Sequence, residues 1–576
     1  MHQSRLGKIQ IANGGYTSDL IFLTCVVLAS VTTYVLRLGF YSDDWAFLAV
    51  MSHSQDQSLA GLVGALSDFN TTLRTRPTQT ASQALLYSAF GLEPLGYHVV
   101  NALLLAGMIA LLYSVLRVLR VPRSIALSVA LVYALLPSYS TDRFWFAAFG
   151  YALSMALALG SIYADLRALG SSRRLLAWKI LSLVLLTAAC LGYEIVIPLL
   201  LVSPVLTWIH IRHRHEEAGR LRGIPAVAYL FAPYSILAIA VAYKASIATG
   251  SGLGGDPLFY VVRLVVGAVT VHFGSFGIGL PHAAWWSIGR LPAVAIALGI
   301  VLGLVIFLYL TIVLRGQDRF AGSRTWVRLA AAGALIFALG YAIFLTTARI
   351  GFSSSGPSNR TGLAAAMGAA AVVVAGVGLL TSRASTEGAR RVAFAASIGT
   401  VCSMGFFVVG ALGESWVASS LRQDAVLGDI RTSLPSIPAG TTIVLHGVCP
   451  YEGPAVVFES SWDLDGVLKI AYGDPTLSAD VTTSNLTVGS EGIETTVYGG
   501  PRTAAFHPYG EQLLVYDHVT GRVIQLVDEQ AALDYFGGRD PDGSGRCPPG
   551  APGYGEVLLP ADRLFRALEA RRFRPW

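Results

Sequence analysis

Long apolar segments separated by short polar loops run along most of the chain, from residue 18 to residue 412. A helix that crosses a bilayer needs about 20 consecutive, mostly apolar residues. The pattern therefore predicts a mainly α, polytopic helical bundle of about eleven spans. We expect these spans at residues 18–38, 95–116, 124–138, 144–164, 175–192, 195–211, 224–245, 291–314, 327–348, 361–381 and 391–412.

Every second loop between the expected spans is basic. Cytoplasmic loops collect Lys and Arg, so these loops predict a cytoplasmic N-terminus and place the end of the chain outside. The basic residues of these loops are Arg117, Arg120 and Arg123; Arg167, Arg173 and Arg174; Arg212, Arg214, Arg220 and Arg222; Arg315, Arg319, Arg324 and Arg328; and Arg383, Arg390 and Arg391.

One further apolar segment, residues 257–280, is also long enough to span a bilayer. If it crossed, the basic loop at residues 315–328 would face outward, against the charge rule for cytoplasmic loops. We therefore expect this segment to lie in the outer interface or to re-enter the membrane from it.

The composition fits a membrane protein rather than a soluble one. Of the 576 residues, 54% are hydrophobic and 13% are charged, whereas soluble domains carry about 25% charged residues. Such long apolar runs exclude the alternating strands of an outer-membrane barrel. The sequence pI near 9.0 is not a nucleic-acid signal, because the basic residues lie in short loops. We expect an integral protein of the plasma (inner) membrane.

The last part of the chain differs from the rest in its charge and in its predicted secondary structure. From Glu414 onward it holds 12 Lys and Arg against 21 Asp and Glu. The segments "TTIVLHGV", "AVVFES" and "QLLVYDHVTGRVIQLVD" have β character, and "ADRLFRALEARRF" predicts a terminal amphipathic helix. We expect two domains, a transmembrane domain at residues 1–414 and a small extracytoplasmic α/β domain at residues 415–576. Cys449 and Cys547 are either two thiols or a disulfide.

Charged and polar residues recur in the loops expected on the outer side, where their burial at the membrane boundary is costly and commonly marks function. Each also has a structural explanation: an ion pair between neighbours, a helix cap, or an anchor to lipid headgroups. An adjacent acidic pair is the hardest to explain structurally, because the carboxylates repel and a helix cap needs only one. The candidate residues are Asp43 and Asp44, Arg76, Asp142, Glu194, and Asn359 with Arg360.

The order of these motifs resembles the GT-C class of polytopic glycosyltransferases, which includes protein O-mannosyltransferases and the lipid A aminoarabinose transferase. The resemblance rests on a first span followed by Asp43–Asp44, on Arg76–Pro77, and on "GLEPLGYHVVNALLLAGMIALLY" leading into the second span. Asp142 in "LPSYSTDRFWF" is a second acid that fits the resemblance, and Asn359–Arg360 shows a weaker similarity. The similarity covers mainly residues 18–210. Many relatives carry Asp-Glu where this chain has Asp-Asp, which leaves open which acid reacts.

The resemblance implies a GT-C-like helical fold and an enzyme that uses a polyprenyl-phosphate sugar. The sugar would pass, with inversion, to a glycan, lipid or protein acceptor of the cell envelope at the outer face. An aspartate, by preference Asp43, would act as general base, and Arg360 and Arg76 would hold the phosphate. We expect no metal, although the acids would suit a divalent cation. Asp44 is the second catalytic candidate, and Asp142, Glu194 and Asn359 are further substrate-binding candidates.

Two other functions fit the same sequence. A transporter or flippase for a lipid-linked sugar would place coupling charges near the bilayer midplane in repeated halves, whereas these charges lie near the expected outer surface and no internal repeat is present. A non-catalytic envelope assembly factor would work without Asp43 and Asp44.

Overall fold

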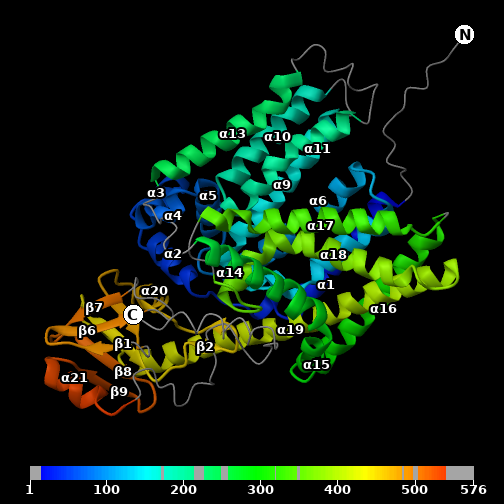
Figure 1. The fold of residues 1–576 in the computed structure, drawn as a ribbon. Coiled ribbons are helices and arrows are strands. Elements are labelled where there is room, and N and C mark those ends of the chain that lie inside the picture. The colour runs from blue at the N-terminus through cyan, green and yellow to red at the C-terminus, as the bar shows by residue number, and fades with distance from the viewer. Residues whose placement is uncertain are drawn as a thin grey trace, which may run out of the picture.

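A computed structural model describes residues 15–169, 174–212, 226–247, 257–317, 319–346, 351–482, 486–496 and 504–539. Helices make up most of these residues, and strands occur only after residue 441 among them. The predicted fold class, a helical bundle followed by a small α/β part, is therefore confirmed (Figure 1).

The first half of the helical part contains long helices interrupted by short ones. Its elements are α1 (Tyr16–Val31), η1 (Val35–Arg37), α2 (Asp43–Ser52), α3 (Leu59–Phe69), α4 (Thr71–Arg74), α5 (Pro77–Phe90), α6 (Pro94–Val118), α7 (Arg123–Leu135), η2 (Pro137–Tyr139), α8 (Thr141–Phe144), η3 (Phe146–Ala148), α9 (Phe149–Leu169), α10 (Leu175–Cys190), η4 (Glu194–Val196) and α11 (Ile197–Arg212).

The second half of the helical part ends in the longest helix described. Its elements are α13 (Ala226–Ile247), α14 (Pro257–Val269), η6 (Thr270–Ile278, a π-helix), α15 (Leu280–Ile288), α16 (Ala293–Arg315), α17 (Ser323–Ala342), η7 (Ile343–Thr346), η8 (Pro357–Gly362), α18 (Leu363–Thr381) and α19 (Glu387–Ser433).

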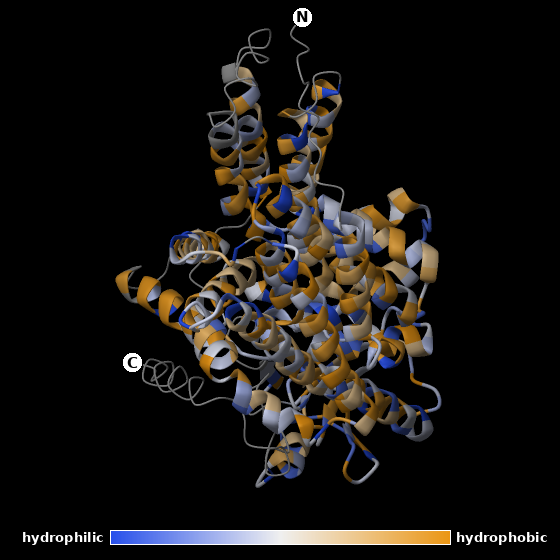
Figure 2. Ribbon diagram, turned by 90° about the vertical axis from the view of Figure 1, so that its right-hand side faces the viewer, coloured by the Kyte–Doolittle hydropathy of each residue, from blue (hydrophilic) through white to orange (hydrophobic). Residues whose placement is uncertain are grey.

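Eight helical segments in the described residues are long and apolar enough to cross a membrane, and four shorter apolar helices, α1, α7, α10 and η4 with α11, match the remaining expected spans. The chain is thus an integral membrane protein, and apolar residues dominate its long helices (Figure 2). Residues 260–278, for which we expect an interfacial position, are among the eight by length and composition. Their position relative to the bilayer stays a prediction.

Glycines bring the long helices into backbone contact. A Cβ on Gly368 of α18 would lie 2.3 Å from the Phe337 backbone nitrogen of α17, and one on Gly340 of α17 would lie 2.5 Å from the Ala365 nitrogen of α18. Small residues at helix contacts are a general device of membrane proteins, because lipid gives no hydrophobic drive for helix association. The apolar core of the helical part is therefore fixed by close packing.

Helix α19 joins the two parts of the structure. It runs without a break from Glu387 to Ser433, so the domain boundary expected after residue 414 lies inside it. A helix of 47 residues is about 70 Å long, more than twice the hydrocarbon thickness of a bilayer. Figure 1 shows it passing from the bundle into the strand-containing part. That boundary stays a prediction.

The strand-containing part is built around a four-stranded sheet in the order β4-β1-β8-β9. Its inner strand β1 is parallel to β4 and β8, while β8 and β9 form an antiparallel hairpin whose turn is "HVTG", residues 518–521. A separate three-stranded sheet has the order β5-β6-β7. The elements are β1 (Thr442–His446), β2 (Tyr451–Glu452), β3 (Ala455–Val456), α20 (Ser461–Tyr472), β4 (Ser478–Val481), β5 (Thr487–Val488), β6 (Gly492–Thr496), β7 (Ala504–Pro508), β8 (Leu513–Asp517), β9 (Arg522–Gln525) and α21 (Glu529–Phe536).

Two predictions for the tail concern its cysteines and its last helix. Cys449 is disulfide-bonded, whereas Cys547 lies outside the described residues. The expected terminal helix "ADRLFRALEARRF" also lies outside them.

Candidate functional site

The acidic pair begins a helix. Asp43 and Asp44 form the first turn of α2, where negative charge is favourable near the helix N-terminus. The preceding residue, Ser42, has φ 48° and ψ −123°, a conformation that is costly for a residue with a Cβ. Such backbone strain persists only where surrounding contacts hold it.

The Asp44 carboxylate binds two backbone N–H groups from different segments of the chain. Its side chain is fully buried, its Oδ2 accepts the Tyr41 N–H at 2.9 Å, and its Oδ1 accepts the Ala147 N–H at 2.7 Å. Burial raises the pKa of Asp44, and the bonds from these two N–H groups oppose that rise. Both carboxylate oxygens are thus occupied, one by the segment that precedes α2 and the other by η3.

We expect Asp44→Asn to destabilise the protein, because its NH2 group would face one of the two N–H donors. An unpaired buried donor costs about 1–3 kcal/mol. Thermal unfolding of the purified protein in detergent should therefore give a lower melting temperature. The control is Asp68→Asn on α3, whose side chain is 85% exposed; an Asp44→Asn protein as stable as this control would contradict the structural role.

Asp43 is the available acid of the pair. Its side chain is partly buried, and within the described residues no hydrogen bond engages its carboxylate. Burial raises the pKa of Asp43 to about 6, while the Arg360 charge lowers it and the Glu459 charge raises it. At neutral pH the carboxylate is therefore mostly ionised and free to take a proton.

Arg360 is presented by a short helix that Asn359 fixes in place. The guanidinium lies 4.4 Å from the Trp145 ring centroid and interacts electrostatically with Asp43. The Asn359 Oδ1 accepts from the Ser140 hydroxyl and the Thr141 N–H, both at 3.2 Å. The Asn359 amide is thus occupied in docking η8, so its contribution to a site would be to position Arg360.

Asp142 is fully buried, and both of its carboxylate oxygens lack a hydrogen-bond partner among the described residues. The Arg143 side chain instead donates to the Ala134 carbonyl, so an ion pair between these neighbours, the structural alternative for Asp142, is not formed. Burial raises the pKa of Asp142, and the Arg360 and Arg143 charges lower it. The carboxyl group therefore belongs to the same electrostatic environment as Arg360.

Arg76 and Glu194 come together as a second cluster. Their side chains form an ion pair at 2.9 Å, and the Lys244 Nζ lies 2.8 Å from the other Glu194 oxygen. The Arg76 guanidinium also lies 3.6 Å from the Tyr193 ring centroid, and Tyr193 stacks on Tyr151 at 3.8 Å between centroids. Two cations on one carboxylate leave a net positive charge.

The two clusters share aromatic residues. Tyr151 and Tyr193 interact electrostatically with Arg360 as well as with Arg76. Both tyrosines are therefore close enough to each arginine to bring Asp43, Arg360 and Arg76 into one neighbourhood. Asp142 belongs to it through the charge of Arg360, and Glu194 through its ion pair with Arg76.

Four members of this neighbourhood are absent from the sequence prediction. Lys244 lies within an apolar helix, and Glu459 lies in a segment whose pattern indicates only a strand. The two tyrosines carry no signal beyond aromatic character. Of the four, Lys244 alone carries a signal in the sequence, because a charged residue within an apolar helix commonly marks function.

No group of three or more His, Cys, Asp and Glu side chains that would suit a metal ion is found in the part of the chain that the structure describes. A divalent cation therefore has no protein ligand set among these residues.

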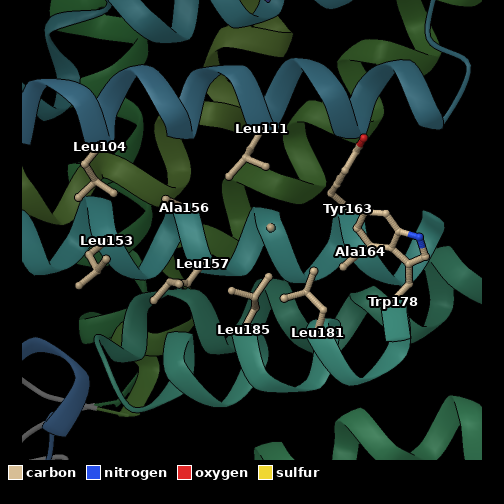
Figure 3. A pocket seen from close by; sticks show the side chains of 11 residues that line it. Leu104, Leu111, Leu153, Ala156, Leu157, Tyr163, Ala164, Trp178, Leu181 and Leu185 are labelled. Atoms are coloured by element: carbon tan, nitrogen blue, oxygen red, sulfur yellow. The ribbon is translucent and has the colours of Figure 1, made fainter. Parts of the chain in front are cut away.

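An apolar pocket of about 310 Å³ lies between α6, α9 and α10 (Figure 3). Leu153, at one end of its lining, is two residues along α9 from Tyr151, and Tyr163 and Trp178 lie at the other. Its lining is Leu104, Leu111, Leu153, Ala156, Leu157, Gly160, Tyr163, Ala164, Trp178, Leu181 and Leu185.

No protein-family model and no curated protein matches this chain. Among solved structures it is similar to the crystal structure of ArnT from Cupriavidus metallidurans bound to undecaprenyl phosphate. That match has a TM-score of 0.34 and 14% identity over 80% of this chain and 85% of that one. The apo structure of the same protein matches with a TM-score of 0.35 and 13% identity, over 81% and 90%. ArnT is a GT-C glycosyltransferase, the class that the sequence motifs resemble. At these TM-scores the likeness assigns no role to any residue here.

Proposed function

We propose that this chain is a membrane glycosyltransferase that moves a sugar from a polyprenyl-phosphate donor to an acceptor hydroxyl. The observation that carries the proposal is that the two adjacent acids differ in their hydrogen bonding. Asp44 is engaged by two backbone N–H groups, whereas Asp43 keeps an available carboxylate in the electrostatic field of Arg360.

The chemistry needs a base and a phosphate-binding cation near each other. Asp43 would take the acceptor hydroxyl proton as that oxygen attacks the anomeric carbon. The bond from the anomeric carbon to the phosphate oxygen would break, and the polyprenyl phosphate would leave with the bonding electrons. Arg360 would stabilise the leaving phosphate, since its planar group suits phosphate oxygens. A single displacement of this kind inverts the anomeric centre.

The remaining candidates take supporting roles in this proposal. The net positive cluster of Arg76, Glu194 and Lys244 would attract the phosphate, and the buried carboxyl group of Asp142, which lies in the field of Arg360, would be a further polar contact for the donor. The apolar pocket between α6, α9 and α10 would accommodate part of the prenyl chain. Its lining of mostly aliphatic side chains, with two aromatic ones, is supporting evidence for a lipid-tail site.

The deciding experiment incubates purified protein with radiolabelled polyprenyl-phosphate sugars and a crude envelope extract. Radiolabel that moves from the lipid fraction to an acceptor only when protein is present supports the proposal. A transporter or flippase would instead move the intact labelled lipid across proteoliposomes without cleaving it, and that result would replace the transferase proposal.

The proposal also requires a defined topology, with the N-terminus cytoplasmic and the strand-containing part outside the plasma membrane. We expect an alkaline phosphatase fusion after Ser433, where α19 ends, to be active. A green fluorescent protein at the same position, exported in the unfolded state, should stay dark. Bright fluorescence with an inactive phosphatase would put the acids on the wrong side for an outer-face donor.

A further inference from the structure

The strand-containing part reaches the N-terminus of α2 through Glu459. The Ser42 hydroxyl donates to the Glu459 Oε1 at 2.7 Å, and the Trp462 indole N–H donates to the Ser42 Oγ at 3.2 Å. The Tyr451 hydroxyl donates to the other oxygen of Glu459. Glu459, between β3 and α20, therefore binds the strained Ser42, the residue directly before Asp43.

The segment that carries Glu459 is itself held firmly. The Asp463 carboxylate accepts the Glu459 N–H at 2.7 Å and the Ser460 N–H at 3.2 Å. Behind it, α20 packs directly on α2: a Cβ on Gly466 would lie 2.5 Å from the Trp45 carbonyl, so only glycine permits this approach. Ser42 is thus bonded to a rigid element of the other part of the protein.

Helix α19 fixes the residue on the other side of the strained position. The Tyr41 hydroxyl donates to the Trp416 carbonyl at 2.8 Å, and the two rings meet edge to face at 4.7 Å between centroids. The backbone at residues 41–43 is therefore held from both sides. Contacts of this kind allow a residue with a Cβ to keep a positive φ.

We propose that the strand-containing part positions the reacting acid, with Glu459 as the positioning residue that holds Ser42 and thereby aims Asp43 at the donor. This inference rests on the proposed function for its catalytic meaning, while the clamp is a property of the fold. It gives the tail a role in the reaction, although the tail itself need contribute no group that touches the substrate.

Among the described residues, three charged side chains act on Asp43 or adjoin it. Arg360 faces it from η8, Glu459 from the segment before α20, and Asp44 follows it on α2. Asp463 lies behind Glu459 on α20. Removing the Glu459 charge therefore changes the field at Asp43 directly.

The first test does not depend on catalysis. Hydrogen exchange of the full-length protein in nanodiscs would be followed in peptides covering residues 41–48. We expect about ten-fold faster exchange there in Ser42→Ala and Glu459→Gln than in wild type, because each change weakens a bond to a charged group. Glu452→Gln, an exposed acid of β2 in the same part of the protein, is the matched control. Unchanged exchange in both test variants would refute the clamp.

The second test measures transfer against pH. Glu459→Gln removes a charge that raises the pKa of Asp43, so the acid limb of kcat should move to lower pH, by about half a unit or more. Ser42→Ala should lower kcat by about ten- to a hundred-fold with little change in KM for the donor, since misplacement of a reacting group lowers the rate. An acid limb that stays at the wild-type pH in Glu459→Gln would show that the Glu459 charge does not act on Asp43. A wild-type kcat in Ser42→Ala would overturn the positioning role, because the Ser42–Glu459 bond would then not affect the placement of Asp43.

The two tests can reject the proposed function and the positioning role independently of each other. If wild-type protein transfers no sugar from any polyprenyl-phosphate donor, the proposed function is rejected while the exchange data still decide the clamp. If transfer is normal and Glu459→Gln matches Glu452→Gln in both tests, the positioning role is rejected and the proposed function stands.

Discussion

Asp43→Asn should abolish most sugar transfer, with kcat falling by about 10²–10⁴-fold, because removal of a general base has an effect of that size. The variant should fold normally. The Asp43 side chain is partly exposed, and no hydrogen bond within the described residues depends on its charge. The measurement is the initial rate of radiolabel transfer from a polyprenyl-phosphate sugar at saturating donor. Expression, melting temperature and donor binding serve as checks on folding.

The pH dependence of the wild-type rate gives an independent check on the same residue. A general base works in its ionised form, and the pKa of Asp43 is about 6. The rate should therefore rise between about pH 5 and pH 7 and level off above, and the residual rate of Asp43→Asn should lack this rise. Asp56→Asn, an exposed acid after α2, is the matched control. Wild-type rates in Asp43→Asn would end the catalytic hypothesis and favour a transporter or an assembly factor.

Much of the helical part could be predicted because the signal for a spanning helix is local. The described residues of all eleven expected segments are mostly helical, since each segment carries enough apolar residues in one run. The first loop is different. Residues 43–90 hold the four helices α2, α3, α4 and α5, which are short and carry no long apolar run. Helices of this kind are stabilised by packing against the rest of the molecule, so the local pattern does not reveal them.

The site could be predicted only as far as residue types allow. Adjacent carboxylates draw attention to the position, but the different hydrogen bonding of Asp43 and Asp44 depends on the Ala147 N–H, which lies 103 residues from Asp44. The Ser42–Glu459 bond joins residues 417 apart. Asn359 is chemically suited to a substrate and is instead occupied by Ser140 and Thr141. Each of these facts is a tertiary contact, for which a single sequence carries no local signal.

Arg360→Ala should reduce the use of the donor by about ten- to a hundred-fold, because a hydrogen bond to a charged group contributes about 1.5–3 kcal/mol. The loss should appear mainly as a higher KM for the polyprenyl-phosphate sugar if Arg360 holds the phosphate before reaction. It should appear in kcat as well if Arg360 stabilises the leaving phosphate. Arg360→Lys should recover only part of the activity, since an ammonium lacks the planar fork that suits phosphate oxygens.

The same variant should also move the acid limb of the pH profile, and the sign of the shift tests whether the Arg360 charge acts on Asp43. The Arg360 charge lowers the pKa of Asp43, so its removal should raise that pKa and shift the acid limb to higher pH. Arg37→Ala is the control, because Arg37 at the end of η1 pairs with Glu414 on α19. If Arg360→Ala keeps both the wild-type donor dependence and the wild-type pH profile, Arg360 only anchors η8, and the phosphate must be held by the cluster around Arg76.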